Sequence, residues 1–258
     1  MKKKLIRIAA ILVVLLLLAI VGVGLFLGSI IKGGVETIGH KIVKVDTKLD
    51  AVSLSLPSCG CKVKGLVIGN PEGFKTKSAI QVGVASLAIS PGSLLSDKIV
   101  VRSVNVEAPE ITFEGDLKGN NLSKILQNIE AATGGDKDSS KSSEKKSGSS
   151  QKKLQVDEFN IIGGKINLSL TMLGGKSATV PLPDIHLKDL GTGPDGITPV
   201  ELTQKVFSEL VASTTKAAAG AIANLGKAAV GAASDLGKGA ADSVDKTTKK
   251  IGDLFKKK

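Results

Sequence analysis

Residues 98–114 read KIVVRSVNVEAPEITFE, a stretch in which apolar and polar residues alternate and a single proline interrupts the pattern. Three valines fall on one phase of this alternation: Val100, Val104 and Val106. A period of two residues is typical of a strand that turns one face toward apolar surroundings. The pattern therefore predicts a strand over 98–108, which 110–114 extends after Pro109.

The same period of two recurs on both sides of this stretch. Further strands are predicted at 51–56, 62–68, 78–90, 154–162, 164–172, 178–182 and 184–190. Within 78–90 the apolar phase changes near Ala85-Ser86, where we expect a bulge or bend. Gly163-Gly164 separates two of the predicted strands and is a good hairpin turn.

The strands predict a fold of the mainly β (α+β) class: a curved antiparallel sheet with a few helices. The chain has six Phe and neither Trp nor Tyr, so Val, Ile and Leu must form its core. Each strand offers one apolar face, which closes on an ordinary core or lines a groove for acyl chains. The candidates for such a groove are Val100, Val104, Val106, Ile166, Leu168 and Leu170.

An uncharged run of 24 residues, IAAILVVLLLLAIVGVGLFLGSII, covers 8–31. About 20 apolar residues span a bilayer as a helix. Lys and Arg residues within 1–7 favour a cytoplasmic N-terminus, which places the rest of the chain across the membrane. A cleaved signal peptide is the alternative, but its apolar region normally runs only ~7–15 residues. We therefore predict a cytoplasmic tail and transmembrane anchor at 1–31.

Composition divides the remaining chain into four sections. A first β-rich section covers 32–133 and a second covers 154–212. Between them, 134–153 is rich in Gly, Ser, Lys and Asp, so it predicts a flexible linker that cannot bury enough apolar surface to fold. Ala, Gly and Lys dominate 213–258, which is either an amphipathic helix on a membrane surface or a partly helical tail in solvent.

Three helices are predicted within the two β-rich sections. A short helix or connector covers 32–44, and 120–132 has helical spacing of its apolar residues, with Asn120 or Asn121 as N-cap. A closing helix begins at Thr198-Pro199, because proline is tolerated in the first turn.

The net charge of +11 is confined to the N-terminal residues, the linker and the last 32 residues. The rest of the chain carries 17 basic and 17 acidic residues and is neutral. A nucleic-acid-binding protein would place a basic patch, usually with stacking aromatic residues, on its folded body. We therefore expect no nucleic-acid partner.

Cys59 and Cys61 are the two cysteines, separated by Gly60. A bridge across one residue is strained, and no thioredoxin-like C-x-x-C pattern surrounds the pair. A structural role is favoured over redox activity, and over a metal site, for which the two histidines are distant in sequence.

The sequence contains none of the G-x-S-x-G, Walker A, H-E-x-x-H or EF-hand patterns. Neighbouring carboxylates such as Glu107 and Glu110 are better explained as solvated strand residues than as paired acid and base groups. We therefore predict a protein that is not an enzyme, with no catalytic residue, no metal ligand and no cofactor.

The order of motifs resembles that of the AsmA-like family of bacterial envelope proteins. An N-terminal anchor is followed by a turn motif that consists of Asn70, Pro71, Gly73 and Phe74 around Glu72. Next come Ser93-Leu94-Leu95, then Ala108-Pro109-Glu110-Ile111 and the helix that begins Gly119-Asn120-Asn121-Leu122. Leu182-Pro183-Asp184-Ile185 and Asp189-Leu190-Gly191 follow the linker. The resemblance covers roughly 1–212.

This resemblance implies a single-pass protein of the bacterial inner membrane, with a cytoplasmic N-terminus and a β-rich periplasmic body that contains an apolar groove. It also implies a role in outer-membrane biogenesis, by binding or transferring phospholipid. The chain is too short to bridge the periplasm alone, so a lipid-binding or accessory role fits better than a complete conduit. An envelope scaffold that interacts with other envelope proteins without lipid transport is the alternative.

Overall fold

The computed structural model describes residues 22, 26–55, 58–116, 119–138, 152–170 and 177–224. Its strands are β1 (Thr47–Lys48), β2 (Ala51–Ser55), β3 (Gly60–Gly69), β4 (Ser78–Ile89), β5 (Lys98–Glu107), β6 (Glu110–Gly115), β7 (Lys153–Ile162), β8 (Lys165–Leu170), β9 (Ser177–Pro181) and β10 (Ile185–Leu190). Its helices are 26–43, η1 (Pro91–Ser93), α2 (Asn121–Asp138) and 199–224. One compact unit ends at Ala217 and a second begins at Ala218. The description below concerns the first unit.

All ten strands belong to one sheet, so the protein is mainly β, as predicted. β1 and β2 pair side by side along β3, and β3 pairs with β4. Beyond β4 lie β5 and β6, then β7 and β8, and finally β10 and β9 at the far edge. The strands before and after the predicted linker therefore form a single sheet.

The sheet is mixed, and the prediction of a wholly antiparallel sheet is wrong. β5 pairs in parallel with β7, in a register that places Val101 beside Val156. β6 pairs in parallel with β8, with Phe113 beside Leu168. Parallel neighbours need a long crossover connection. Here α2 lies between β6 and β7 in sequence, and it gives the chain the length to return to the start of β5.

The predicted hairpin at Gly163-Gly164 is also wrong. β7 and β8 pair with β5 and β6 in the same direction, so the chain continues through the two glycines without turning back. Gly163 has φ +64°, a conformation that glycine adopts readily. A Cβ on Gly164 would lie 2.8 Å from Leu182 Cδ2 and 3.1 Å from Pro109 Cγ, so a larger residue would require these side chains to shift.

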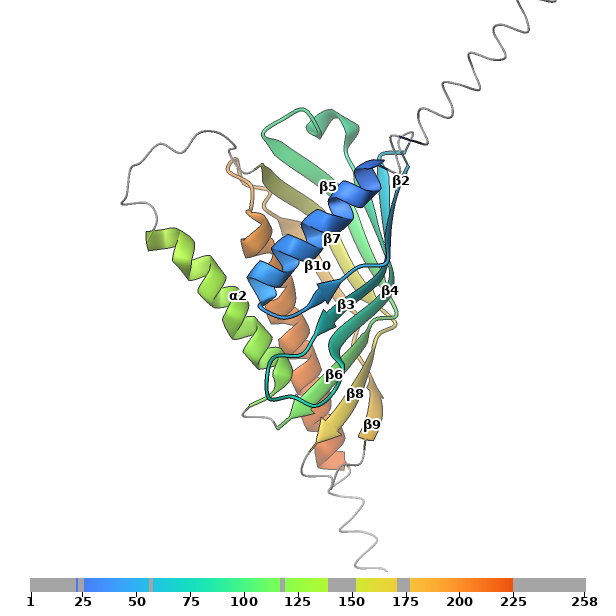
Figure 1. The fold of residues 1–258 in the computed structure, drawn as a ribbon, viewed down its shortest axis with the longest axis vertical. Coiled ribbons are helices and arrows are strands. Elements are labelled where there is room, and N and C mark those ends of the chain that lie inside the picture. Colours follow the sequence, from blue (N-terminus) through green and yellow to red (C-terminus); the bar gives the residue numbers. More distant parts are fainter. Residues whose placement is uncertain are drawn as a thin grey trace, which may run out of the picture. The chain divides into compact units, whose positions relative to one another are not determined.

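These glycines lie on a crease that crosses the sheet. At this level β5 ends and β6 begins, and the backbone N–H of Ala108, which has φ +45°, donates to the Ile162 carbonyl at 2.8 Å. Next to it, the N–H of Lys165 donates to the Pro109 carbonyl at 2.9 Å, and the N–H of Leu182 donates to the Gly164 carbonyl at 2.9 Å. The breaks between β5 and β6, between β7 and β8, and between β9 and β10 thus lie side by side, which bends the sheet (Figure 1).

The register of β4 shows where the predicted irregularity lies. Pairing with both neighbours is unbroken from Val84 to Ala88, so there is no bulge at Ala85-Ser86. The register shifts instead between Ala88 and Ile89 against β5, and between Ile68 and Gly69 of β3. The apolar phase of β4 does change at Gly83, since Val82 is buried before it and Ala85 is buried after it. Gly83 lies at the level of the crease, because the next residue, Val84, pairs with Glu107 at the end of β5.

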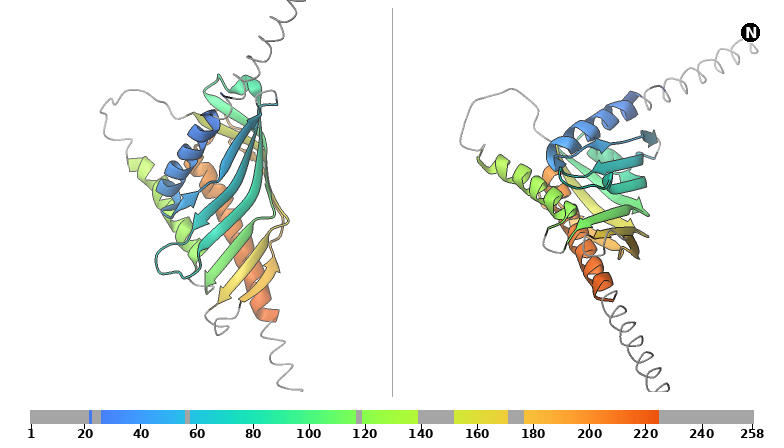
Figure 2. Two further views of the ribbon diagram at one scale, coloured as in Figure 1. Left: turned by 45° about the vertical axis from the view of Figure 1, so that its right-hand side comes forward. Right: turned by 60° about the horizontal axis from the view of Figure 1, so that its bottom comes forward.

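The helices gather on one side of the curved sheet (Figures 1 and 2). Helix 26–43 runs along β2 and β1 in the opposite direction. A Cβ on Gly28 would lie 2.6 Å from the Val52 carbonyl, Lys32 Nζ donates to the Asp50 carbonyl at 3.1 Å, and Glu36 accepts from the backbone N–H of Leu49 at 2.9 Å. The helix predicted at 32–44 thus also includes residues 26–31.

Helix α2 is longer than the 120–132 predicted and reaches Asp138, inside the predicted linker. Asn120 caps it, because its side-chain oxygen accepts from the Ser123 N–H at 2.9 Å. Leu122, Ile125 and Ile129 are fully buried one above the other. No proline follows them before Asp138, so a helix held by this packing extends into the polar residues.

Three sequence predictions fall largely outside the described residues. They concern most of the anchor at 8–31, most of the linker at 134–153 and the tail beyond 224, so each stays a prediction. Within the described ranges, no helix has both the length and the apolarity that crossing a membrane requires.

Candidate functional site

Apolar side chains form a continuous strip on the face of the sheet that the helices cover. At one end lies a buried cluster of Val101, Val104, Val156 and Leu190. Half-buried apolar side chains pack against it from the strands and from helix 199–224: Leu87, Ile89, Val106, Phe159, Leu187, Leu202 and Val206. Four of these, Val106, Phe159, Leu202 and Val206, also line a cavity further along the sheet, so the cluster leads into it.

The cavity has a volume of about 260 Å³ and lies between the sheet and helix 199–224. We call it the apolar cavity. Its walls contain one polar residue, Thr203, whose hydroxyl donates within the helix to the Pro199 carbonyl at 2.8 Å. The other lining residues are Leu66, Ile68, Ile80, Val82, Val106, Pro109, Ile111, Phe159, Ile161, Leu202, Val206, Phe207 and Leu210. A hollow with such walls suits a hydrocarbon chain and offers no partner to a charged group.

A capping box fixes the start of the helix over this cavity. The Thr198 hydroxyl accepts from the Glu201 N–H at 3.1 Å, and the Glu201 carboxylate accepts from the Thr198 N–H at 2.9 Å. The backbone hydrogen bond and then the side-chain hydrogen bond from Thr198 lower the pKa of Glu201. The predicted helix start at Thr198-Pro199 is confirmed, and Leu202 and Val206 are thereby placed over the sheet.

Along β6 and β8, the same face of the sheet is sealed. The side chains of Ile111 and Phe113 on β6, and of Ile166 and Leu168 on β8, have no exposed surface. The equally buried Leu122, Ile125 and Ile129 belong to α2, whose first residue, Asn121, bonds to β6. We call this set of side chains the sealed core. It meets the apolar cavity at Ile111, so the strip is closed at this end.

The structure divides the six groove candidates between these surroundings. Val104 lies in the buried cluster and Val106 lines the apolar cavity. Ile166 and Leu168 lie in the sealed core. Val100 is half-buried and belongs to neither the cluster nor the cavity wall. Leu170 ends β8, and its side chain is outside the described set.

Sequence reasoning missed the residues from β3, β4 and β7 that face the cavity, among them Leu66, Val82 and Phe159. Their alternation was visible, but the phase changes at the crease. Because of that change, Val82 lines the cavity and Leu87 packs against the buried cluster on the same face, although they lie five positions apart in the strand. Only the pairing of neighbouring strands shows which phase faces inward on each side of the crease.

The turn motif at 70–77 is a structural clamp beside the sealed core. The fully buried Asn121 donates from Nδ2 to Asn70 Oδ1 and to the Thr112 carbonyl, both at 2.8 Å, and its Oδ1 accepts from the Glu114 N–H at 3.0 Å. Asn70 Nδ2 in turn donates to the Thr76 carbonyl at 2.7 Å. Within the turn, Pro71 is buried, Phe74 is half-buried and Gly73 has φ +95°.

Glu114 closes the same turn from β6. Its carboxylate accepts from the N–H groups of Lys75 at 2.7 Å and Thr76 at 2.8 Å, and from the Thr76 hydroxyl at 2.5 Å. Burial by itself would raise the pKa of Glu114 and is the largest single influence. The three hydrogen bonds and the charge of Lys75 together outweigh burial, so the pKa of Glu114 is lowered.

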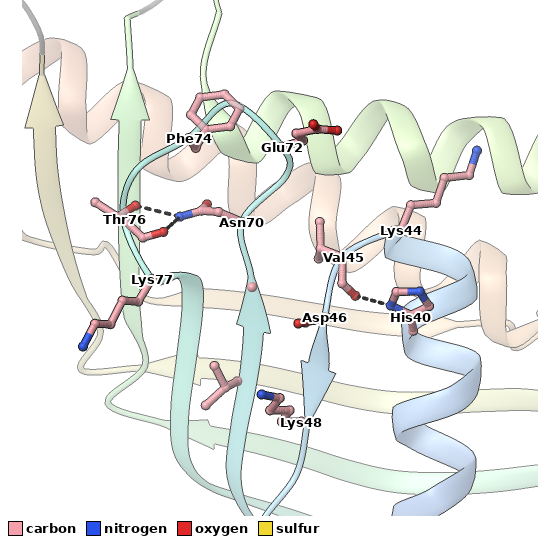
Figure 3. A pocket seen from close by; sticks show the side chains of 12 residues that line it. His40, Lys44, Val45, Asp46, Lys48, Asn70, Glu72, Phe74, Thr76 and Lys77 are labelled. Carbon is pink, nitrogen blue, oxygen red and sulfur yellow. Dashed lines mark hydrogen bonds between the residues drawn. The ribbon is translucent and has the colours of Figure 1, made fainter.

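A second hollow, of about 480 Å³, lies between this turn, β1 and the end of helix 26–43 (Figure 3). His40 closes one side, where its Nδ1 donates to the Val45 carbonyl at 3.0 Å. Lysines and carboxylates alternate around the rest of the wall: Lys44, Asp46, Lys48, Glu72 and Lys77. Because the charges nearly balance, this hollow has no strong preference for an anion or a cation. The apolar cavity is therefore the candidate functional site.

Cys61 lies buried on β3, beside Leu87 of β4, and burial raises the pKa of its thiol. A raised pKa disfavours the reactive thiolate. Cys59 precedes the strand in a left-handed conformation, with φ +46°. The surroundings of Cys61 fit the structural role that the sequence favoured.

Comparison with known proteins identifies the family. The model of the AsmA family matches residues 1–178, more than half of the chain, so the protein belongs to the AsmA family. Membership indicates a role related to the cell envelope. No curated protein and no solved structure matches the chain.

Proposed function

We propose that this protein is anchored in the bacterial inner membrane by residues 8–31 and binds the acyl chain of a phospholipid in the apolar cavity. The observation that carries the proposal is the lining of that cavity, which is apolar except for Thr203. Burying hydrocarbon there contributes roughly 0.8 kcal/mol per methylene group. The same surface offers no group for acid–base chemistry, so binding without catalysis is the function that fits.

The sealed core supports lipid binding over lipid conduction. A conduit needs an apolar path that is open at both ends, whereas this strip stops at the fully buried Ile111 and Phe113. We therefore favour lipid binding or delivery, as part of outer-membrane biogenesis, over passage of lipid along the whole sheet. The body would lie in the periplasm, with a cytoplasmic N-terminus.

Photo-crosslinking tests this proposal on the full chain. The protein is reconstituted into liposomes that contain a phospholipid with a photoactivatable acyl chain, and crosslinked peptides are identified by mass spectrometry. Crosslinks are expected on the segments that carry Phe159 and Val206. Crosslinks within 8–31 should occur in every variant, because the anchor is surrounded by lipid, and they serve as an internal standard.

Val206→Phe sharpens the test by filling the cavity. Displacing two methylene groups costs about 1.6 kcal/mol, so crosslinking at Phe159 should fall roughly tenfold. Ser208→Phe is the matched control, because residue 208 is exposed on the same helix. If Val206→Phe leaves crosslinking at Phe159 unchanged, or if only 8–31 is labelled, the cavity does not bind acyl chains. That result would favour the alternative function, an envelope scaffold that interacts with other proteins without bound lipid.

A further inference from the structure

The connection between β4 and β5 projects two leucines into solvent. Leu95 is 98% exposed and Leu94 is 41% exposed, although both are large apolar side chains. The backbone of this connection is held in place. Ser93 Oγ donates to the Ser90 carbonyl at 2.7 Å and accepts from the Val100 N–H at 2.9 Å. These hydrogen bonds fix the backbone of the turn from which the two leucines project.

A second exposed apolar surface lies at the same end of the sheet, on helix 26–43. Phe26 is 68% exposed and Ile30 is 55% exposed, one helical turn further on. Both belong to the last part of the apolar run 8–31 that is predicted to enter a bilayer.

Strand pairing places the exposed leucines and the exposed side chains of helix 26–43 at the same end of the sheet. Helix 26–43 begins against β2, where Gly28 approaches Val52. β2 leads to the start of β3 through the Ser55–Gly60 pair, and Gly60 lies beside Ala88, two residues before the connection that carries Leu94 and Leu95. Figures 1 and 2 show this connection and the start of the helix at the same end of the sheet, and β9 at the other.

Lysines lie beside the connection that carries the two leucines. Lys152 Nζ donates to the Leu94 carbonyl at 2.8 Å, and Lys98 Nζ donates to the Gly193 carbonyl at 3.3 Å. The backbone N–H of Lys153 donates to the carbonyl of Asp97 at 3.0 Å. Exposed apolar side chains with lysines beside them match the boundary between the acyl chains and the anionic headgroups of a membrane.

We propose that Leu94 and Leu95 insert into the surface of the bilayer that holds the N-terminal anchor. This inference rests on the membrane anchorage in the proposed function and adds a second point of contact. Two contacts fix the orientation of the body, whereas one flexible attachment would not. The inserted end is the one where the buried cluster around Val101 begins, so the apolar strip starts at the membrane and leads to the cavity.

Tryptophan fluorescence tests the insertion, because the chain has no tryptophan of its own. The full chain with Leu95→Trp is reconstituted into liposomes that contain phosphatidylglycerol and brominated phosphatidylcholine. The matched control is Thr179→Trp, at an exposed position on β9. Interfacial side chains lie roughly 5–10 Å into the headgroup–acyl boundary, so bromine should remove about half of the emission of Leu95→Trp and almost none of the control.

Flotation of the liposomes separates the possible failures. If the protein floats with the lipid and Leu95→Trp is quenched no more than Thr179→Trp, the insertion is disproved while the anchor stands. The leucines would then be free or bound to a protein. If neither variant floats with the lipid, both the anchor and the insertion are disproved. Quenching of Leu95→Trp alone supports the proposal.

Discussion

The sealed core and the apolar cavity are two halves of one strip of the sheet, built from the same residue types. Phe113 and Leu168 in the sealed core have no exposed surface. Val106 and Phe159 remain half-buried around a hollow of about 260 Å³ beside helix 199–224. The comparison shows that strands with the same alternation become closed core or the wall of a hollow according to how closely other elements pack on them.

Polar bonding differs between the two halves as well. The sealed core is fastened by Asn121, whose three hydrogen bonds join α2 to β6 and to the turn at Asn70. Over the apolar cavity, two backbone hydrogen bonds of 2.8 Å between Ile197 and Leu154 tie the residue before the helix to β7, and the helix itself packs through apolar side chains. A helix held mainly by apolar contact can move aside for a ligand at lower cost than one tied by buried hydrogen bonds.

The largest expected difference between the halves comes from a buried charge. Leu168→Asp places a carboxylate where no water reaches, which should cost about 4 kcal/mol or more and prevent folding. Val106→Asp should leave a folded protein that no longer crosslinks to acyl chains, because the cavity admits water to its half-buried side chain. Circular dichroism during heating, together with photo-crosslinking, measures both effects. Equal loss of folding in the two variants would show that the cavity is part of a closed core.

A smaller effect, dependent on pH, should distinguish the clamp beside the sealed core. The pKa of Glu114 is lowered in the folded protein, so its stabilisation is present above the unfolded-state value of roughly 4.3. That stabilisation is lost as the pH falls through the lower folded-state value. Glu114→Gln should therefore cost about 1–2 kcal/mol at pH 7, with the gap to the parent protein narrowing in acid.

Urea unfolding at pH 7, and at several values below pH 4, measures this gap. A gap that is constant with pH would mean that the carboxylate charge does not hold the turn. Glu110→Gln is a suitable control, because that carboxylate is more exposed and pairs with Lys165 on the surface at 2.8 Å.

The smallest effect is expected at the start of the helix over the cavity. Thr198→Ala removes the cap and should lower the free energy of unfolding by about 0.5–1 kcal/mol. Hydrogen exchange should become faster in 199–210 and stay unchanged in α2, because the capping box of Thr198 and Glu201 is local to the helix it begins. Asn120→Ala is the corresponding change at the cap of α2. Faster exchange in both helices of either variant would contradict the independence of the two halves.

The sequence by itself determined the features that local chemistry controls. Alternation predicts most of the strands within a few residues, and Thr198-Pro199 with Glu201 carries the signal for a helix start. The order of motifs identified the AsmA family, which the family match confirms. The turn at Asn70 was likewise visible, because Asn, Pro and Gly act on their own backbone.

The tertiary structure decided which strands pair in parallel, where the sheet bends, and which apolar residues are sealed. Gly163-Gly164 is compatible with a hairpin, and only the neighbouring Pro109 and Leu182 make it part of a crease. Leu168 and Val106 have the same local alternation, yet one is core and the other lines a cavity. The physical reason is that pairing and burial depend on partners far away in sequence, and a two-residue period specifies two faces without specifying what covers either one.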